Sequence, residues 1–144
     1  MKTLAILLLS VFLVACGSPA TNHNSTTANV NKTPTDYAAL IDRANPLSNS
    51  KSSIAYQFEL VKAGDYDKLV DCFTEKAKRK LTREIVESAK VTAEKVSYDD
   101  VVATIDEEEN SNGKFAHIRM KDHRSLVVLT FKDGKWLSDQ VWFK

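Results

Sequence analysis

The sequence has little of what most catalytic and metal-binding motifs require. Its 144 residues include two cysteines, three histidines and four glycines. There is no glycine-rich loop of the kind that cradles phosphate, and no serine with the flanking glycines of a nucleophile elbow. The histidines lack the spacing of a zinc site. The sequence therefore predicts neither a metal nor a cofactor.

The chain also has no large excess of positive or negative charge. The formal net charge is +1, whereas a nucleic-acid-binding protein needs a clustered basic face to neutralise phosphates. The one basic run, Lys76–Lys80, lies between acidic residues that include Asp71, Glu75 and Glu84. We interpret this run as a solvated helix face and expect no nucleic-acid partner.

A hydrophobic run long enough to span a membrane is also missing. The longest apolar stretch, Leu4–Ala15, has twelve residues. As a helix it would be about 18 Å long, short of the ~30 Å hydrocarbon core of a bilayer. With Lys2 before it, the stretch is typical of the hydrophobic region of a signal peptide, so residues 1–15 are predicted to be one.

The apolar stretch ends in Leu-Val-Ala-Cys, residues 13–16. This motif resembles the lipobox of bacterial lipoproteins. The resemblance implies that the Cys16 thiol receives a diacylglyceryl group, that cleavage occurs before Cys16, and that a further fatty acid such as palmitate acylates the new amino terminus. Two or three acyl chains give stable membrane anchoring. An ordinary secretory signal with an incidental cysteine, or an uncleaved anchor, is the alternative.

The residue after the cysteine, Gly17, bears on location. An acidic residue at this position would resemble the signal that retains lipoproteins in the inner membrane of many Gram-negative bacteria. The resemblance therefore implies that Gly17 allows transfer to the outer membrane, facing the periplasm, in an organism that has one. A lipid-anchored place in the cell envelope is the prediction for either envelope type.

Lipidation of Cys16 would leave Cys72 as a single thiol. No intrachain disulfide would then be available. Cys72 falls near the apolar stripe of a predicted helix, where a free cysteine behaves as a small hydrophobic residue. A nucleophilic Cys72 is the less favoured alternative.

Residues 16–50 are predicted to be the lipidated cysteine and a flexible tether. Up to about Thr35 the chain is rich in Asn, Thr and Ser and has no aromatic residue, so it cannot bury enough apolar surface to fold. A short helix is predicted over 36–44, with Thr35 as its cap. A flexible segment of this length has a root-mean-square reach of about 30 Å, which lets the domain work just off the membrane surface.

Residues 51–144 are predicted to fold as one α+β domain. Apolar residues at helical spacing predict three helices, with Gly64 ending the first and Asp65, Thr82 and Ser97 capping later segments. The period then falls to two and predicts an antiparallel meander of four strands. These are residues 102–109, 114–121, 125–132 and 135–143, the third expected to be buried on both faces and the last two joined by a hairpin at Asp133-Gly134.

Three segments of this domain, AGDYDKLVDCFT, LTREIVESA and FKDGKWLSDQVWF, together resemble the NTF2-like (cystatin-like) superfamily and the small envelope lipoproteins that carry such a domain. The resemblance implies N-terminal helices packed on a curved antiparallel sheet, as a cone. Enzymes of this superfamily use His and Asp in the cone for proton transfer at carbon acids, and many of its domains pair through the sheet.

The predicted hairpin turns fix a strand register. They place His117, Val128 and Asp139 in one row beside Arg119, with about 10 Å between the backbones of His117 and Asp139. A catalytic His117–Asp139 pair is one interpretation. We favour an outer, half-solvated face, because the opposite face is the better core. That face carries Ala116, Ile118, Met120, Val127, Leu129, Phe131, Trp136 and Trp142.

Two groups of apolar residues suggest further contacts. Trp136 and Trp142 either bracket a pocket mouth or an interface, or pack in the core. Leu126, Val141 and Phe143 are predicted to form an apolar patch on the outer sheet face, where a second copy of the chain could dock. A homodimer through this face is therefore one hypothesis.

Together these features predict a membrane-anchored envelope lipoprotein whose small domain binds a partner protein or a small ligand without catalysis. A small lyase or isomerase that uses Asp139 and His117 is one alternative, and it requires both side chains to point into a closed cavity under the helices. An inhibitor or immunity protein acting in the envelope is another.

Overall fold

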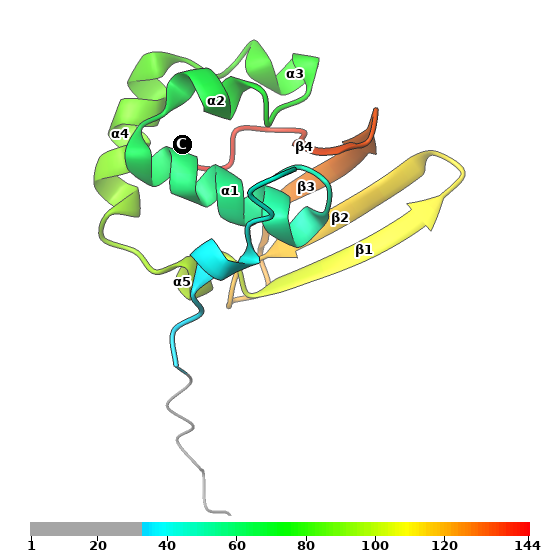
Figure 1. Ribbon diagram of the computed structural model, residues 1–144, viewed down its shortest axis with the longest axis horizontal. Helices are drawn as coiled ribbons and strands as arrows, with labels where there is room; N and C mark the ends of the chain where they lie inside the picture. Colours follow the sequence, from blue (N-terminus) through cyan, green and yellow to red (C-terminus); the bar gives the residue numbers. More distant parts are fainter. Residues whose placement is uncertain (1–32) are drawn as a thin grey trace, which may run out of the picture. The chain divides into compact units, whose positions relative to one another are not determined.

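A computed structural model describes residues 33–144. The predicted signal peptide, the lipobox and Cys16 lie outside the described residues. Helices fill the first half of the described chain and a four-stranded antiparallel sheet fills the second, so the predicted α+β class is confirmed (Figure 1). The helices pack on one face of a curved sheet.

The helical half contains a 3-10 helix, η1 (Tyr37–Leu40), and five α-helices within residues 33–144. Their bounds are α1 Ser50–Ala63, α2 Tyr66–Val70, α3 Glu75–Lys78, α4 Arg83–Ala93 and α5 Tyr98–Val101. The predicted stop and caps are confirmed. Gly64 ends α1 with a φ of 72°, a left-handed conformation that favours glycine. Asp65 and Thr82 accept hydrogen bonds from the first turns of α2 and α4, and Ser97 forms a capping box at α5.

The folded region begins earlier than residue 51. Ile41 and Leu47 are buried, and the Leu47 carbonyl accepts a hydrogen bond of 2.9 Å from the Trp136 N–H. The short helix over 36–44 is a single 3-10 turn capped by Asp36 rather than Thr35. These contacts join residues almost a whole domain apart in the sequence, and the polar composition of this stretch gives no sign of them.

The sheet has the order β1-β2-β3-β4. Its strands are β1 Thr104–Asn110, β2 Gly113–Arg119, β3 Ser125–Lys132 and β4 Lys135–Ser138. The predicted register is confirmed where His117 pairs with Val128 and Thr130 with Leu137. Strand β3 alternates between buried and half-buried residues, so the expectation that both of its faces are buried is wrong. The helices cover only one face of the sheet, and that leaves the other face partly solvated.

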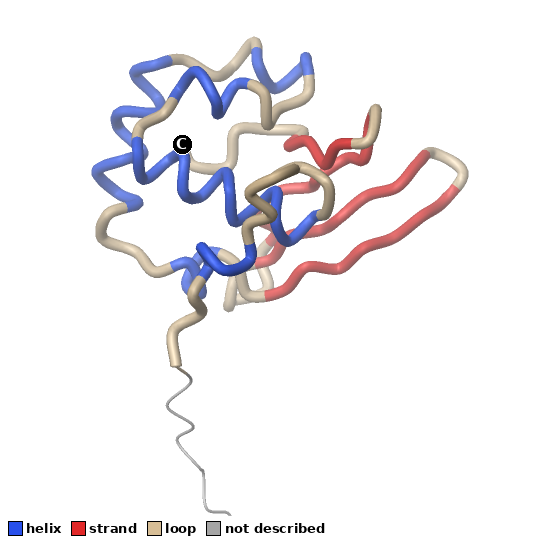
Figure 2. The backbone as a smooth tube through the Cα atoms, viewed as in Figure 1, coloured by secondary structure: helices blue, strands red, loops and turns tan. Residues whose placement is uncertain are grey.

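Strand β4 ends at Ser138, and the last residues leave the sheet (Figure 2). Ser138 is held by the loop before α3, because its N–H donates to the Cys72 carbonyl at 2.9 Å and its carbonyl accepts from the Thr74 N–H at 3.0 Å. Residues 139–144, which we call the C-terminal tail, then pack against the helices. Val141 is therefore buried in the core, which corrects the prediction that it lies on the outer face of a longer strand.

The inner face of the sheet forms the core with α1. Most of the residues predicted for this face are buried, namely Ala116, Ile118, Val127, Leu129 and Trp136. Phe131 is an exception, with 39% of its surface exposed. Phe131 lies in the exposed last part of β3, and its ring packs on Trp136 with 5.3 Å between the centroids. Met120 and Trp142 are half-buried.

The two edges of the sheet differ. The edge at β4 is extended by an isolated bridge between Phe73 and Ser138. The other edge strand, β1, carries four consecutive acidic residues, Asp106–Glu109, all exposed. Charges on an edge strand disfavour pairing with the edge of another sheet.

Candidate functional site

A cavity of about 610 Å³ opens between α4, α1, the turn side of the β2–β3 hairpin and the C-terminal tail. Its walls are mostly apolar, with polar side chains on α4 and at the tail end. We call it the α4 cavity. Its lining residues are Phe58, Val61, Glu84, Ile85, Ser88, Ala89, Thr92, Ala93, Val96, Val101, Met120, Leu126, Trp142, Phe143 and Lys144.

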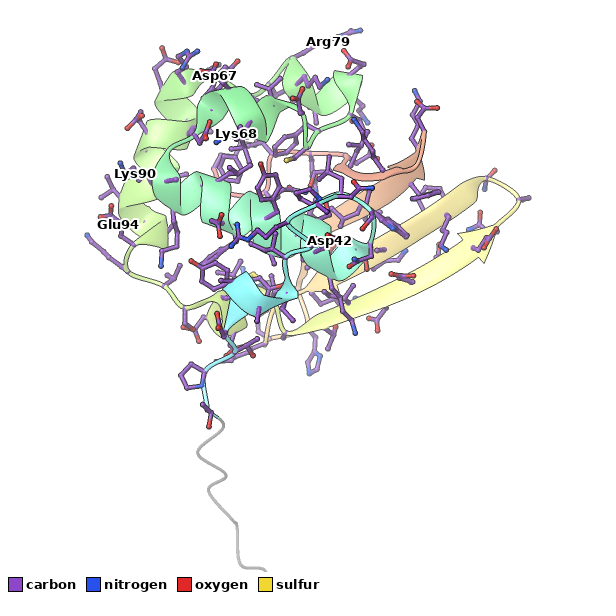
Figure 3. The ribbon with its side chains drawn as sticks, in the orientation of Figure 1. Asp42, Asp67, Lys68, Arg79, Lys90 and Glu94 are labelled. Carbon is purple, nitrogen blue, oxygen red and sulfur yellow. The ribbon has the colours of Figure 1, made fainter. Side chains whose placement is uncertain are left out.

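Helix α4 forms one long wall of the cavity. Lys90 on α4 and Glu94 directly after it, both labelled in Figure 3, do not line the cavity. On the cavity side, small residues recur in pairs on successive turns, Ser88 with Ala89 and Thr92 with Ala93. Their short side chains leave space that longer ones would fill. This pattern explains why a cavity lies here rather than a closed helix–sheet contact.

The opposite wall is built around Trp142. The indole Nε1–H donates to Gln57 Oε1 at 3.1 Å, and the Ser138 hydroxyl donates to the same oxygen at 2.6 Å. Gln57 Nε2 donates in turn to Ser53 Oγ at 3.2 Å. Gln57, Ser53 and Ser138 are all buried. This polar cluster fixes the tail, and with it the Trp142 ring, against α1.

The cavity lies between two hydrophobic clusters. Ile85 and Phe143 belong to the cluster around α2 and α4. Val96, Val101 and Leu126 belong to the cluster around α5 and the sheet. Trp142 packs against both clusters. The cavity is therefore lined by apolar residues of both clusters, and the Trp142 ring contacts both of them.

The polar residues predicted to form a row on the sheet lie outside the α4 cavity. His117 Nε2 lies 3.4 Å from Glu108 Oε1, and Arg119 Nε lies 3.5 Å from Asp106 Oδ2. These are cross-strand contacts with β1 on the solvated face. None of the four residues lines the α4 cavity. The favoured interpretation of His117 and Arg119 as outer-face residues agrees with this placement.

Asp139 is not in contact with His117. Its N–H donates to the Val128 carbonyl at 3.1 Å, and Val128 pairs with His117 on the other side. Two strand spacings, about 10 Å, therefore separate the backbones of Asp139 and His117. Asp139 is exposed. The structure thus lacks, among its described residues, the His–Asp pair under the helices that a lyase or isomerase of the predicted type requires.

The two tryptophans have separate roles. Trp136 is a core residue whose carbonyl accepts from the Ser53 hydroxyl at 2.8 Å. Trp142 alone of the pair lines the α4 cavity. Leu126 and Phe143 also line this cavity instead of forming an outer patch with Val141. The predicted outer patch is therefore wrong, and a homodimer through the sheet face stays a prediction.

Cys72 is buried, and its Sγ lies 3.6 Å from the Lys68 carbonyl. Burial raises the pKa of the thiol to about 12, so the reactive thiolate is scarce at neutral pH. This environment fits the favoured interpretation of Cys72 as a small hydrophobic residue.

Sequence reasoning missed Gln57 and the α4 cavity. The available signal for Gln57 was a carboxamide within the apolar stripe of a helix, next to Phe58 and near Ile54 and Val61. The signal for the cavity was the paired small residues of α4. Neither signal indicates on its own what packs opposite.

Comparisons with protein-family models, with curated proteins and with solved structures each found no match to this chain. Within residues 33–144, no cluster of three or more His, Cys, Asp or Glu side chains is arranged to hold a metal ion. The helices of the same region are all too short or too polar to cross a bilayer. Among the described residues a second cavity, of about 620 Å³, has a more polar lining that includes Lys51, Asp99 and Lys121, so the α4 cavity is the more apolar of the two.

Proposed function

We propose that the protein is an envelope lipoprotein of the NTF2-like type, anchored through Cys16, whose domain binds a small apolar ligand in the α4 cavity. The observation that carries the proposal is the cavity itself. Its volume of about 610 Å³ falls within the ~300–1,000 Å³ of small-molecule sites, which are concave and mostly apolar.

The chemistry of the lining supports binding over proton transfer. The titratable groups that line the cavity are Glu84 and Lys144, both on exposed residues. A hydrogen bond from the Thr82 side chain lowers the pKa of Glu84, which keeps this carboxylate ionised at the start of α4. A general base would need a raised pKa and a place within the apolar part of the site.

The binding proposal can be tested with Nile red, an uncharged apolar dye that fluoresces in dry environments. The protein would be the mature chain from residue 16 with Cys16→Ser, so that no acyl chain competes. We expect saturable binding that Ser88→Phe abolishes, because the ring would fill the cavity beside Ala89. Val91→Phe is the control, since Val91 is 56% exposed on the same helix and does not line the cavity.

Two results would contradict the binding proposal. One is a failure of the unsubstituted domain to bind Nile red. The other is equal binding by the Ser88→Phe and Val91→Phe variants, which would place the dye elsewhere. Circular dichroism of both variants would establish that each remains folded.

The anchoring proposal has an independent test in cells. Cys16→Ser in the full chain removes the thiol that the lipobox resemblance assigns to lipidation. The protein should then move from the membrane fraction to the soluble fraction. Membrane association that persists unchanged in the Cys16→Ser variant would refute a lipid anchor at this residue.

A further inference from the structure

We infer that Asn112 is a site of spontaneous deamidation, which converts this neutral side chain to aspartate or isoaspartate in the turn between β1 and β2. The inference goes beyond the proposed function and does not depend on the α4 cavity. It depends on the position of Asn112 in the turn, on the glycine that follows it, and on the contacts of the other asparagines.

The reaction needs only the chain and water. The Gly113 backbone nitrogen loses its proton and bonds to the carboxamide carbon of Asn112, while the amide nitrogen takes up a proton and leaves as ammonia. The product is a succinimide ring. Water then opens this ring at either carbonyl carbon. Attack at the side-chain carbonyl gives aspartate, and attack at the main-chain carbonyl gives isoaspartate.

The turn presents Asn112 to solvent. Ser111 and Asn112 are the two turn residues between the paired residues Asn110 and Gly113, and all four are exposed. The Asn112 N–H donates to Asn110 Oδ1 at 2.8 Å, whereas the Asn112 side-chain amide makes no hydrogen bond to another described residue. No hydrogen bond of this amide therefore has to break before the side chain can turn towards the Gly113 nitrogen.

Gly113 is suited to be the nucleophile. It has no side chain to hinder approach to its nitrogen, and its φ of 133° lies in a region that favours glycine. It pairs with Asn110 at the end of the β1–β2 ladder, and the ends of such elements open most readily. Opening of this last pair frees the nitrogen without unfolding of the sheet.

Two other asparagines of residues 33–144 lie in settings that oppose the reaction. Asn45 precedes Pro46, whose nitrogen carries no hydrogen to lose. Asn49 Oδ1 accepts the Ser52 N–H at 2.8 Å as the cap of α1, and the residue after Asn49, Ser50, is buried. Neither should form the ring readily in the folded protein.

Asn110 is the sharpest comparison, because it lies beside the same turn. Its Nδ2 donates to Glu108 Oε1 at 3.3 Å, and its Oδ1 accepts the Asn112 N–H. The residue that follows it, Ser111, has a side chain. Two hydrogen bonds that must first open slow a step by about tenfold or more, so Asn112 should react faster than Asn110 by about that factor.

Ageing of the purified protein tests the inference. The mature chain carrying Cys16→Ser would be kept in mildly alkaline buffer and digested with trypsin, and mass spectrometry would detect the replacement of an NH2 group by OH. Asn110 and Asn112 share the peptide Val96–Lys114, so fragment ions would separate them. We expect Asn112 to react faster than Asn110 or Asn49 by about tenfold or more, and to give both aspartate and isoaspartate.

Three results would overturn the inference. One is an equal rate at Asn112, Asn110 and Asn49. Another is aspartate without isoaspartate, because a ring intermediate opens to both. The third comes from Asn112→Gln, an exposed substitution whose longer side chain closes a ring much less readily. An unchanged mass gain in the Val96–Lys114 peptide of this variant would exclude Asn112 as the site.

The two products should affect the hairpin differently. Aspartate adds only a negative charge near the acidic run Asp106–Glu109. Isoaspartate also adds a carbon atom to the main chain of the two-residue turn, whose length sets the register of β1 on β2. Hydrogen exchange in β1 should therefore be faster in the isolated isoaspartate form than in the Asn112→Asp variant, and equal exchange would overturn this effect on the hairpin.

Discussion

The buried carboxamide of Gln57 gives a sharp quantitative prediction. The substitution Gln57→Met keeps the side chain unbranched and close in size, and both residues favour helices. It removes the oxygen that accepts from the Ser138 hydroxyl and the Trp142 Nε1–H. Both donors then lose their acceptor while the packing of α1 is largely kept.

The cost can be worked out from these contacts. A buried donor left without a partner costs about 1–3 kcal/mol. Ser138 is fully buried and should bear that cost, whereas Trp142 is half-buried and can regain part of it from water. Ser53 keeps the hydrogen bond that it donates to the Trp136 carbonyl. We therefore expect Gln57→Met to lower the free energy of unfolding by about 2–4 kcal/mol.

Urea denaturation of the mature chain carrying Cys16→Ser, followed by circular dichroism, measures this loss. Gln140→Met is the matched control, because Gln140 is exposed in the same tail, and it should cost less than about 0.5 kcal/mol. In a Trp142→Phe background, the cost of Gln57→Met should fall by about 1 kcal/mol, since one of the two hydrogen bonds is already absent. A cost of Gln57→Met below about 1 kcal/mol, or no coupling to Trp142, would refute the role assigned to the polar cluster.

Three further predictions concern single side chains. The Tyr98 hydroxyl is buried with no hydrogen-bond partner among the described residues, so Tyr98→Phe should raise the free energy of unfolding by about 1 kcal/mol; a lower urea midpoint would count against this. The buried Cys72 thiol, with its pKa raised to about 12, should resist iodoacetamide at neutral pH until urea unfolds the protein, and equal labelling rates in both states would contradict its burial. The pKa of Asp100 is lowered to about 2 by the hydrogen bond from Lys121. Its stabilisation is therefore present above the unfolded value of about 3.9 and lost as pH falls through about 2. Thermal unfolding of Asp100→Asn should thus differ from that of the unsubstituted protein at neutral pH and converge with it near pH 2, whereas a constant difference would show another cause.

Local signals explain why much of the fold could be predicted from the sequence. Gly64, Asp65, Thr82 and Ser97 act through hydrogen bonds and backbone conformations a few residues away, so their effect is visible in the sequence. The Asp133-Gly134 turn fixes the register of β3 and β4 in the same way. Alternation then placed the inner face of the sheet correctly for most of its residues.

The errors came from contacts that join distant parts of the chain. Val141 continues the apolar alternation of β4, but the bonds of Ser138 to the loop before α3 end the strand and turn the tail towards the helices. Leu47 lies in a polar stretch and is ordered by Trp136. The α4 cavity depends on the first of these contacts, since the tail supplies Trp142 as one of its walls.

The two edges of the sheet are blocked in different ways, and this affects how crowded molecules can associate. The loop at Phe73 pairs with the β4 edge, and the β1 edge carries the exposed acidic run Asp106–Glu109. Two copies brought together along β1 would set like charges opposite one another. Crowded molecules are therefore less prone to join edge to edge into one shared sheet.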